Sequence, residues 1–183
     1  YLVQVRGLSR ADASLVTSML FIGTIIGSPI VGWLSDRIRR RRLPMIAGTI
    51  IASGLILMLM YVSHLSMTAL LLVFFGLGFI TSTQIISYPL IAESNPLTLT
   101  GTAEGLASVL IMAGGFTQPL FAWLMEWHWT HYYIKKIPFY SISNYRMALA
   151  IMPVAFILAL IIALMIRETY CVGYHRENHS QEK

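Results

Sequence analysis

The chain has 183 residues, of which 56% are hydrophobic and 11% are charged, and its formal net charge is +5. Soluble domains carry roughly 25% charged residues, and a water-soluble fold of this length could not bury so much apolar surface. Composition therefore excludes the soluble classes and indicates a polytopic membrane protein. The single cysteine, Cys171, also excludes an intramolecular disulfide and a cysteine-built metal site. Because the sequence starts at Tyr1 without a signal-peptide pattern, we expect it to be a piece of a longer protein.

Five continuous apolar runs are long enough to cross the hydrocarbon core as helices. The first of them would cover about 33 Å at ~1.5 Å rise per residue. We therefore predict an all-α bundle over residues 14–166, preceded by the end of another helix and an outer loop over 1–13 and followed by a cytoplasmic tail over 167–183. The predicted spans cover residues 14–35, 44–62, 68–92, 102–125 and 146–166.

Two glycines in the first predicted span indicate close helix packing. Gly23 and Gly27 form a G-x-x-x-G pair, and the missing side chains let a second helix backbone approach. We expect another span to pack closely against this face.

A dense group of arginines follows the first span directly. Asp36 ends the apolar run, and arginines stand at positions 37, 39, 40, 41 and 42 before the next run begins at Pro44. Positive residues accumulate in the cytoplasmic loops of membrane proteins, so we predict that this turn and, by alternation of the spans, the C-terminus are cytoplasmic. The arginines lie in a turn and not on a basic face with interleaved aromatics, so we expect no nucleic-acid partner.

This turn resembles a known signature. The sequence from position 32 onward is similar to the loop motif G-x-x-x-D-R-x-G-R-R/K of major facilitator superfamily transporters. The matching residues are Gly32, Asp36, Arg37, Arg40 and Arg41. Arg39 stands where the motif has its second glycine, so we expect the tight turn to be made differently here.

A second family pattern follows the third predicted span. The pattern E-x-x-P-x-x-x-R-G-x-A-x-G occurs especially in members similar to sugar porters. It is matched at Glu93, Pro96, Gly101, Ala103 and Gly105. Thr100 stands where the pattern has arginine, which removes one expected member of an inner charge network.

The two motifs together resemble the C-terminal half of such a transporter, namely helices eight to twelve of a twelve-helix bundle made of two six-helix halves. The resemblance implies a symporter in a plasma or bacterial inner membrane, which moves a small solute by alternating access and couples it to protons or sodium ions. The expected partners are the solute, the lipid bilayer and the missing N-terminal half of the same protein. A non-transporting membrane sensor or assembly subunit that kept the fold is the alternative.

Polar residues in the third and fourth spans form the candidate substrate pathway. Thr81, Gln84 and Tyr88 fall at i, i+3 and i+7 and therefore share one helical face. Gln118 lies in the fourth span, beside a weak point at Gly114-Gly115 and Pro119. Polar groups at this depth usually face a bundle interior or a wet cavity. We expect these spans to line the pathway and the fifth span not to; interhelical hydrogen bonding alone is the alternative.

Two acidic residues at span ends predict a charge cluster. Asp36 and Glu93 end spans on the same predicted side, and the resemblance brings these ends together. We expect both to pair with an arginine of the turn and to act as a conformational latch, since solvated pairs stabilise by only about 0–1 kcal/mol. Glu104, which we predict in the first turn of the fourth span, is interpreted as stabilising a helix terminus, with proton coupling as the alternative.

No catalytic signature is present in the sequence. G-x-S-x-G, a P-loop and C-x-x-C are all missing, so we expect neither an enzyme nor a cofactor. His128 and His131 could suggest a metal site, but no carboxylate or third histidine has a suitable spacing. The aromatic-rich segment around them is typical of a membrane interface, so we expect no metal.

Overall fold

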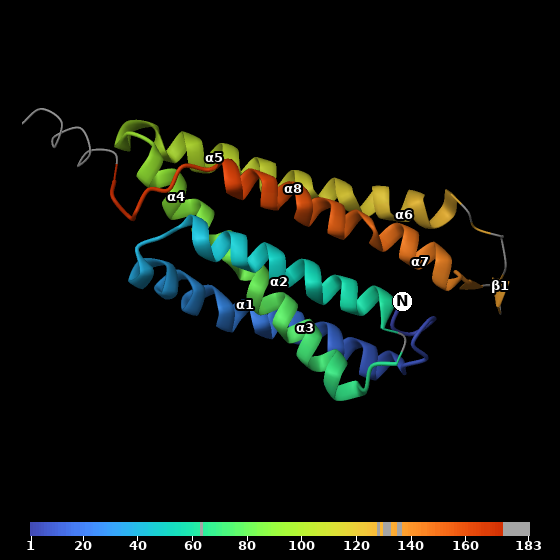
Figure 1. Ribbon diagram of the computed structural model, residues 1–183. Coiled ribbons are helices and arrows are strands. Elements are labelled where there is room, and N and C mark those ends of the chain that lie inside the picture. Colours follow the sequence, from blue (N-terminus) through green and yellow to red (C-terminus); the bar gives the residue numbers. More distant parts are fainter. Residues whose placement is uncertain (63, 128, 130–132, 135–136, 174–183) are drawn as a thin grey trace, which may run out of the picture.

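The structure, a computed structural model, describes residues 1–173 except 63, 128, 130–132 and 135–136. The described residues form five helical spans, each long and apolar enough to cross a membrane. This confirms the predicted all-α fold class of five spans (Figure 1). The first two spans are α1 (Arg10–Ile38) and α2 (Arg42–Tyr61).

The other three spans are each interrupted. The third consists of α3 (Met67–Thr81), the 3-10 helix η1 (Ser82–Ile86) and α4 (Ser87–Ser94). The fourth consists of α5 (Leu97–Ala113), the 3-10 helix η2 (Gly114–Phe116) and α6 (Thr117–Trp127). The fifth consists of α7 (Ile142–Leu149) and α8 (Ile151–Met165), and two-residue strands β1 (Tyr133–Ile134) and β2 (Ile137–Pro138) pair antiparallel before it. Gly114 and Gly115 lie at the η2 break. Glycine is a poor helix former, so these two residues weaken the α-helix at this point.

Serine side chains fix the start of three helices. Ser9, Ser66 and Ser141 each accept a hydrogen bond from the backbone N–H three residues later. This satisfies one of the N–H groups that a helix N-terminus leaves without an intrahelical partner. Ser141 also forms a capping box with Asn144, whose side chain accepts from the Ser141 backbone.

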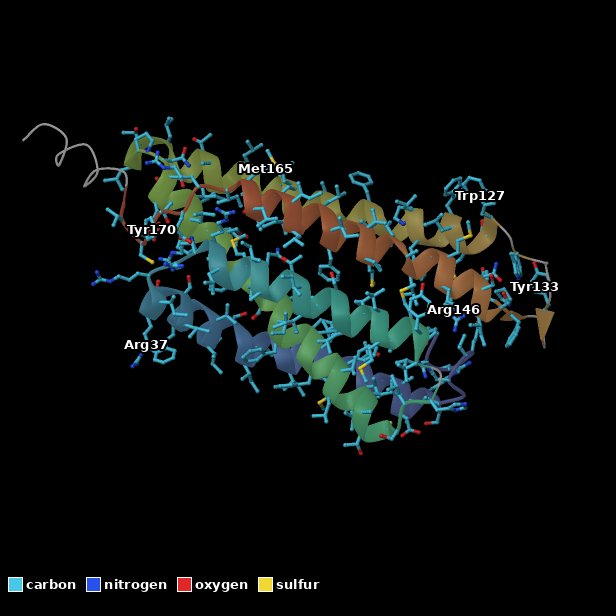
Figure 2. The ribbon with its side chains drawn as sticks, in the orientation of Figure 1. Arg37, Trp127, Tyr133, Arg146, Met165 and Tyr170 are labelled. Atoms are coloured by element: carbon cyan, nitrogen blue, oxygen red, sulfur yellow. The ribbon has the colours of Figure 1, made fainter. Side chains whose placement is uncertain are left out.

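The chain turns place its loops at two opposite ends of the bundle. The α1–α2 turn, the α4–α5 turn and the segment after α8 lie at one end, whereas the N-terminus and the β strands lie at the other (Figure 1). Figure 2 accordingly shows Arg37 and Tyr170 at the first end and Trp127, Tyr133 and Arg146 at the second. Residues that are far apart in sequence therefore meet at the arginine-rich end.

Glycines allow α1 and α3 to pack with their backbones close together. A Cβ built on Gly23 would overlap the backbone of Phe75, and one on Gly27 would lie 2.7 Å from the carbonyl oxygen of Phe79. From the opposite side, a Cβ on Gly78 would overlap the backbone of Leu20. The predicted close approach at Gly23 and Gly27 is thus confirmed, and the partner is the third span.

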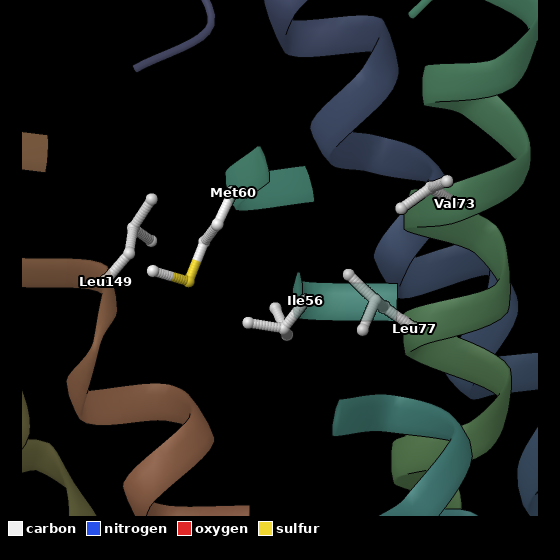
Figure 3. Packing of buried hydrophobic residues seen from close by; sticks show 5 residues of the cluster. All are labelled: Ile56, Met60, Val73, Leu77 and Leu149. Atoms are coloured by element: carbon white, nitrogen blue, oxygen red, sulfur yellow. The ribbon is translucent and has the colours of Figure 1, made fainter. Parts of the chain in front are cut away.

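One apolar cluster joins the second, third and fifth spans. Ile56 and Met60 of α2 pack with Val73 and Leu77 of α3 and with Leu149 of α7 (Figure 3). Burial of such side chains contributes roughly 1.5–3 kcal/mol each in an aqueous reference, and in lipid the same contacts act through van der Waals packing. This cluster holds α3, and hence the polar residues that follow it, against α2.

The fourth span has a different environment. None of the residues of α5 and η2 is buried, and Met112 and Phe116 are among the most exposed apolar side chains. Large apolar surfaces of this kind mark contact with lipid or with another protein segment. Most of the surface of α5 and η2 is therefore not covered by other described residues.

The largest differences from the predicted spans are at three helix starts. α1 begins at Arg10 and α5 at Leu97, four and five residues before the predicted starts, and α7 begins at Ile142. Since α5 begins at Leu97, Glu104 is not in the first turn, and its interpretation as a helix-terminus charge is wrong. His128, His131 and residues 174–183 of the predicted tail lie outside the described residues.

Candidate functional site

The turn between α1 and α2 is closed by an arginine in a left-handed conformation. Arg39 has φ 54° and ψ 37°, and its N–H donates to the Asp36 carbonyl over 3.2 Å. The Arg40 N–H donates to the Ser35 carbonyl, and the buried Ser35 hydroxyl donates to the Arg40 carbonyl over 3.1 Å. The position where the resembling motif has glycine thus keeps a glycine-like conformation although its residue is arginine.

This turn directs Arg41 into a cluster with two carboxylates. Its Nη1 lies 2.5 Å from Asp36 Oδ1, and its Nη2 lies 2.6 Å from Glu93 Oε1 at the end of α4. Nη1 also donates to the Ser35 hydroxyl over 3.2 Å. Arg41 therefore bridges the turn and the third span, and it is the arginine that joins Asp36 and Glu93.

The two ion pairs differ in their exposure to solvent. The side chains of Arg41 and Glu93 are 8% and 14% exposed, whereas that of Asp36 is 65% exposed. Burial of the Arg41 guanidinium opposes its charge, but hydrogen bonds with Glu93 and Asp36 outweigh burial and raise the pKa of Arg41 above its ordinary value. The Arg41–Glu93 pair is thus the buried part of the cluster.

The segment after α8 completes this cluster. The Glu168 carboxylate accepts from the backbone N–H of Arg41 over 2.6 Å and from that of Arg42 over 3.1 Å, at the N-terminus of α2. The Thr169 hydroxyl donates to Glu93 Oε2 over 2.5 Å. A carboxylate is favoured at a helix N-terminus because of the helix dipole. Residues 167–173, which we call the C-terminal strap, therefore tie the end of α8 to α2 and α4.

The remaining residues of the predicted signature loop lie apart from the cluster. The Arg37 guanidinium stacks over the Trp33 ring at 5.2 Å from its centroid. Arg40 is exposed and lines a groove beside α2. A Cβ added to Gly32 would meet no atom of the described chain within 4 Å. The structure thus brings together Asp36, Arg41 and Glu93 but not the other three.

Three of the four predicted pathway residues line one open depression. Thr81, Gln84 and Tyr88 surround a volume of about 350 Å³ together with Thr24 and Ser28 of α1. Thr24 lies near the middle of α1, and Gln84 lies in η1 near the middle of the third span. Hydroxyl and amide side chains thus form most of its lining, and the depression lies at mid-span depth.

Two findings on the pathway differ from the sequence-based expectation. Gln118 is exposed on α6 and does not line this depression. Thr81 and Gln84 also border a second, more apolar depression of about 310 Å³, which Phe156 of α8 helps to line. The fifth span thus shares this second depression with Thr81 and Gln84 of the third span.

Sequence reasoning missed the contributions of α1 and of the strap. Thr24 and Ser28 are spaced i, i+4, so they share a face of the first span, and this spacing was a usable signal. Glu168 and Thr169 gave no comparable signal, because a charged segment without apolar periodicity is typical of a disordered tail.

In the described part of the chain, no group of three or more His, Cys, Asp or Glu residues could hold a metal ion.

The comparisons with known proteins agree on one family. The family model described as Major Facilitator Superfamily matches residues 1–179. The chain is 29% identical over 130 residues to the D-galactonate transporter of Escherichia coli O6:H1, which covers 66% of this chain and 29% of the relative. It is 31% identical over 124 residues to the gentisate transporter of Corynebacterium glutamicum, which covers 68% of this chain and 28% of the relative.

The match spans less than a third of the length of these two relatives. No match to a solved structure was found. The family model covers nearly the whole chain, and the five apolar spans make it an integral membrane protein. The family is one of transport proteins and not of enzymes, and it implies a twelve-helix bundle. This chain belongs to the major facilitator superfamily.

Proposed function

We propose that the chain is the C-terminal portion of a secondary transporter that moves a small solute across the membrane by alternating access. Family membership and two relatives that are named as transporters support transport of a small solute. In this proposal the chain supplies helices eight to twelve, and the remainder of the protein supplies the other helices. A sensor or assembly subunit that kept the fold is the competing proposal, and it predicts no uptake of any solute.

The observation that carries this proposal is the polar depression at mid-span. The hydroxyl groups of Thr24, Ser28 and Thr81 donate to backbone carbonyls of their own helices. Their lone pairs are left to accept hydrogen bonds, while the Gln84 amide and the Tyr88 phenol can both donate and accept. A solute with hydroxyl groups can therefore be bound without the cost of a bare charge at mid-membrane depth.

The chemistry of the relatives' named solutes is compatible with this depression. D-galactonate and gentisate are organic anions that also carry hydroxyl groups, as their names denote. Arginines of the described chain lie near span ends, in contrast to the mid-span position of Gln84. We infer that the depression binds the hydroxyl-bearing part of a small organic solute and that any carboxylate is bound by the remainder of the protein.

The ion-pair cluster supports a conformational role at the cytoplasmic end. Arg41 holds the ends of α1 and α4 together through Asp36 and Glu93. We propose that these ends separate and rejoin during alternating access, and that the cluster is the latch of one access state. We expect Asp36→Asn to slow transport more than it lowers thermal stability, because the Asp36 side chain is largely exposed. Unchanged transport in that variant would remove the latch from the proposal.

The orientation and the coupling ion also belong to the proposal. We place the arginine turn and the strap in the cytoplasm, since arginines accumulate on that side. A reporter fusion within residues 37–43 should therefore give a cytoplasmic signal.

For coupling we propose protons or sodium ions, with Glu104 as a candidate carrier because it lies inside α5 and not in its first turn. Loss of proton dependence in Glu104→Gln would support the proton form.

The decisive experiment is uptake by the complete protein in proteoliposomes, with D-galactonate, gentisate and neutral sugars as test solutes. For a transported solute, Thr24→Val should raise KM roughly 3–10-fold, the equivalent of one hydrogen bond. Thr117→Val is the matched control, since its hydroxyl also donates to a backbone carbonyl but does not line the depression. Equal effects of the two variants would contradict the proposed site, and no uptake of any solute would favour the competing proposal.

A further inference from the structure

The groove that Arg40 lines beside α2 lies at the arginine-rich end, outside the proposed solute pathway. It has a volume of about 500 Å³ and lies between the first part of α2 and the C-terminal strap. Arg40 and Arg42 line it together with apolar side chains of α2, and Glu168 and Tyr170 of the strap line its other side. We propose that this groove binds an anionic phospholipid, with the phosphate at Arg40 and Arg42 and an acyl chain along α2.

The arginines of the turn are not equivalent in their existing partners. Arg41 is engaged by Asp36 and Glu93, so its charge is already compensated. Nε of Arg42 is buried and has no hydrogen-bond partner among the described residues. A buried donor of this kind costs roughly 1–3 kcal/mol when it is not satisfied. If the Arg42 side chain shifts toward the groove, a phosphate oxygen can supply this missing acceptor, and Arg40 supplies a second positive charge.

The acidic residue of the groove does not oppose an anion strongly. Glu168 lines the same groove, but its two carboxylate oxygens each accept a backbone N–H, from Arg41 and from Arg42. The partial positive charge of the helix N-terminus therefore compensates this carboxylate. The side chains of Arg40 and Arg42 remain the charged groups that a phosphate would meet.

The apolar wall favours a lipid over a free phosphate. Leu43, Ile46, Ala47 and Ile50 fall at i, i+3, i+4 and i+7, so they form one stripe that starts at the N-terminus of α2. The stripe rises about 10 Å along the helix, and Leu43 and Ile50 are 45% and 55% exposed. Charge at the membrane surface with an apolar stripe leading inward matches the two chemical parts of a phospholipid. Basic pockets at helix ends on the cytoplasmic side recognise anionic head groups in this way.

The test measures lipid binding by native mass spectrometry on the complete protein, with dioleoyl phosphatidylglycerol and dioleoyl phosphatidylcholine as probes. Phosphatidylglycerol should bind more tightly, and the double variant Arg40→Gln/Arg42→Gln should weaken it about 30-fold at physiological salt. Arg37→Gln/Arg39→Gln is the matched control, because it removes the same charge from the same turn outside the groove. Equal losses in both variants would mean diffuse attraction of a positive loop and would overturn the site.

Two further measurements separate a lipid from a soluble phosphate and from misfolding. Ile46→Ser/Ile50→Ser should also weaken phosphatidylglycerol binding, whereas Leu158→Ser/Ile162→Ser, on the exposed surface of α8, should not. Glycerol 3-phosphate should not displace the lipid; displacement at equal concentration would show a plain phosphate site and contradict the lipid assignment. Arg40→Lys/Arg42→Lys keeps the charge and should retain most of the binding, and failure of this rescue in a folded variant would contradict the proposal.

Discussion

Arg41 and Glu93 stand 52 positions apart in the sequence, and their side chains form an ion pair with an Nη2–Oε1 distance of 2.6 Å. The pair joins the turn after the first span to the end of the third, and Thr169 of the strap bonds the same carboxylate. Three separate chain segments thus converge on one carboxylate at the arginine-rich end. Because the pair is nearly buried, loss of Arg41 would leave the Glu93 carboxylate without a charged partner, whereas loss of Glu93 would leave Arg41 paired with the exposed Asp36 alone.

The two carboxylates bound to Arg41 should differ in their effect on stability. Glu93→Gln is expected to lower the free energy of unfolding by about 3–5 kcal/mol, because it breaks a buried pair. Asp36→Asn should cost only about 0–1 kcal/mol, since that carboxylate is largely solvated. Thermal unfolding of both variants in the same detergent measures the difference. Equal losses would mean that the exposed and the buried pair contribute alike.

The strap should protect Cys171 from thiol reagents. Burial raises the pKa of the Cys171 thiol, and its Sγ lies 3.9 Å from the Ser35 carbonyl oxygen. Since the thiolate is the reactive form, alkylation at pH 7.5 should be slower than that of an exposed cysteine and should accelerate as the pH rises. Glu168→Gln, which weakens the bonds to the α2 N-terminus, should increase the rate. A rate that Glu168→Gln leaves unchanged would show that the strap does not control access.

The glycine contacts between α1 and α3 should be sensitive to a single methyl group. A Cβ at Gly78 would overlap the backbone of Leu20, so Gly78→Ala is expected to cost about 1–3 kcal/mol through overpacking. Gly54 of α2 has no atom within 4 Å of an added Cβ, and Gly54→Ala should stabilise its helix by roughly 0.5–1 kcal/mol. Unfolding midpoints of the two variants should therefore shift in opposite directions.

Arg39 should be replaceable by glycine with a gain in stability. A non-glycine residue in the left-handed conformation costs roughly 1–2 kcal/mol, and Arg39 has this conformation at the C-cap of α1. Arg39→Gly is therefore expected to raise the unfolding temperature, whereas Arg39→Ala should not. A destabilised Arg39→Gly would indicate that the arginine side chain offsets the backbone cost by contacts of its own.

Apolar length was sufficient to predict five spans, because it is a local feature of the sequence. The cluster of Asp36 with Glu93 needed the family resemblance as well, since acidic span ends alone do not say which ends meet. The identity of the bridging arginine was not predictable. Five arginines occupy the turn, and the backbone path through the left-handed Arg39 helps to decide which of them reaches Glu93. The start of α5 was also missed, because Thr98, Thr100 and Gly101 are poor helix formers.

For the pathway residues, too, the sequence predicted what depends on helical spacing but not what depends on helix packing. The helical spacing of Thr81, Gln84 and Tyr88 predicted a shared face, and these three residues do line one depression. The sequence could not tell which neighbour faces them. The close α1–α3 packing through Gly23, Gly27 and Gly78 brings Thr24 and Ser28 to that face, while Gln118 lies elsewhere.

The central claim is that the depression between α1 and η1 lines the solute pathway. We would replace Cys171, place single cysteines at positions 24, 81, 84 and 88, and label the complete protein with a membrane-impermeant thiol reagent. Positions 158 and 162 on the exposed face of α8 serve as controls; position 156 does not, because Phe156 lines the second depression. We expect the reagent to label the four depression positions and not the controls. Whichever of D-galactonate and gentisate is transported should slow the labelling at those four positions. Labelling at 158 and 162 with silence at 24, 84 and 88 would contradict this claim.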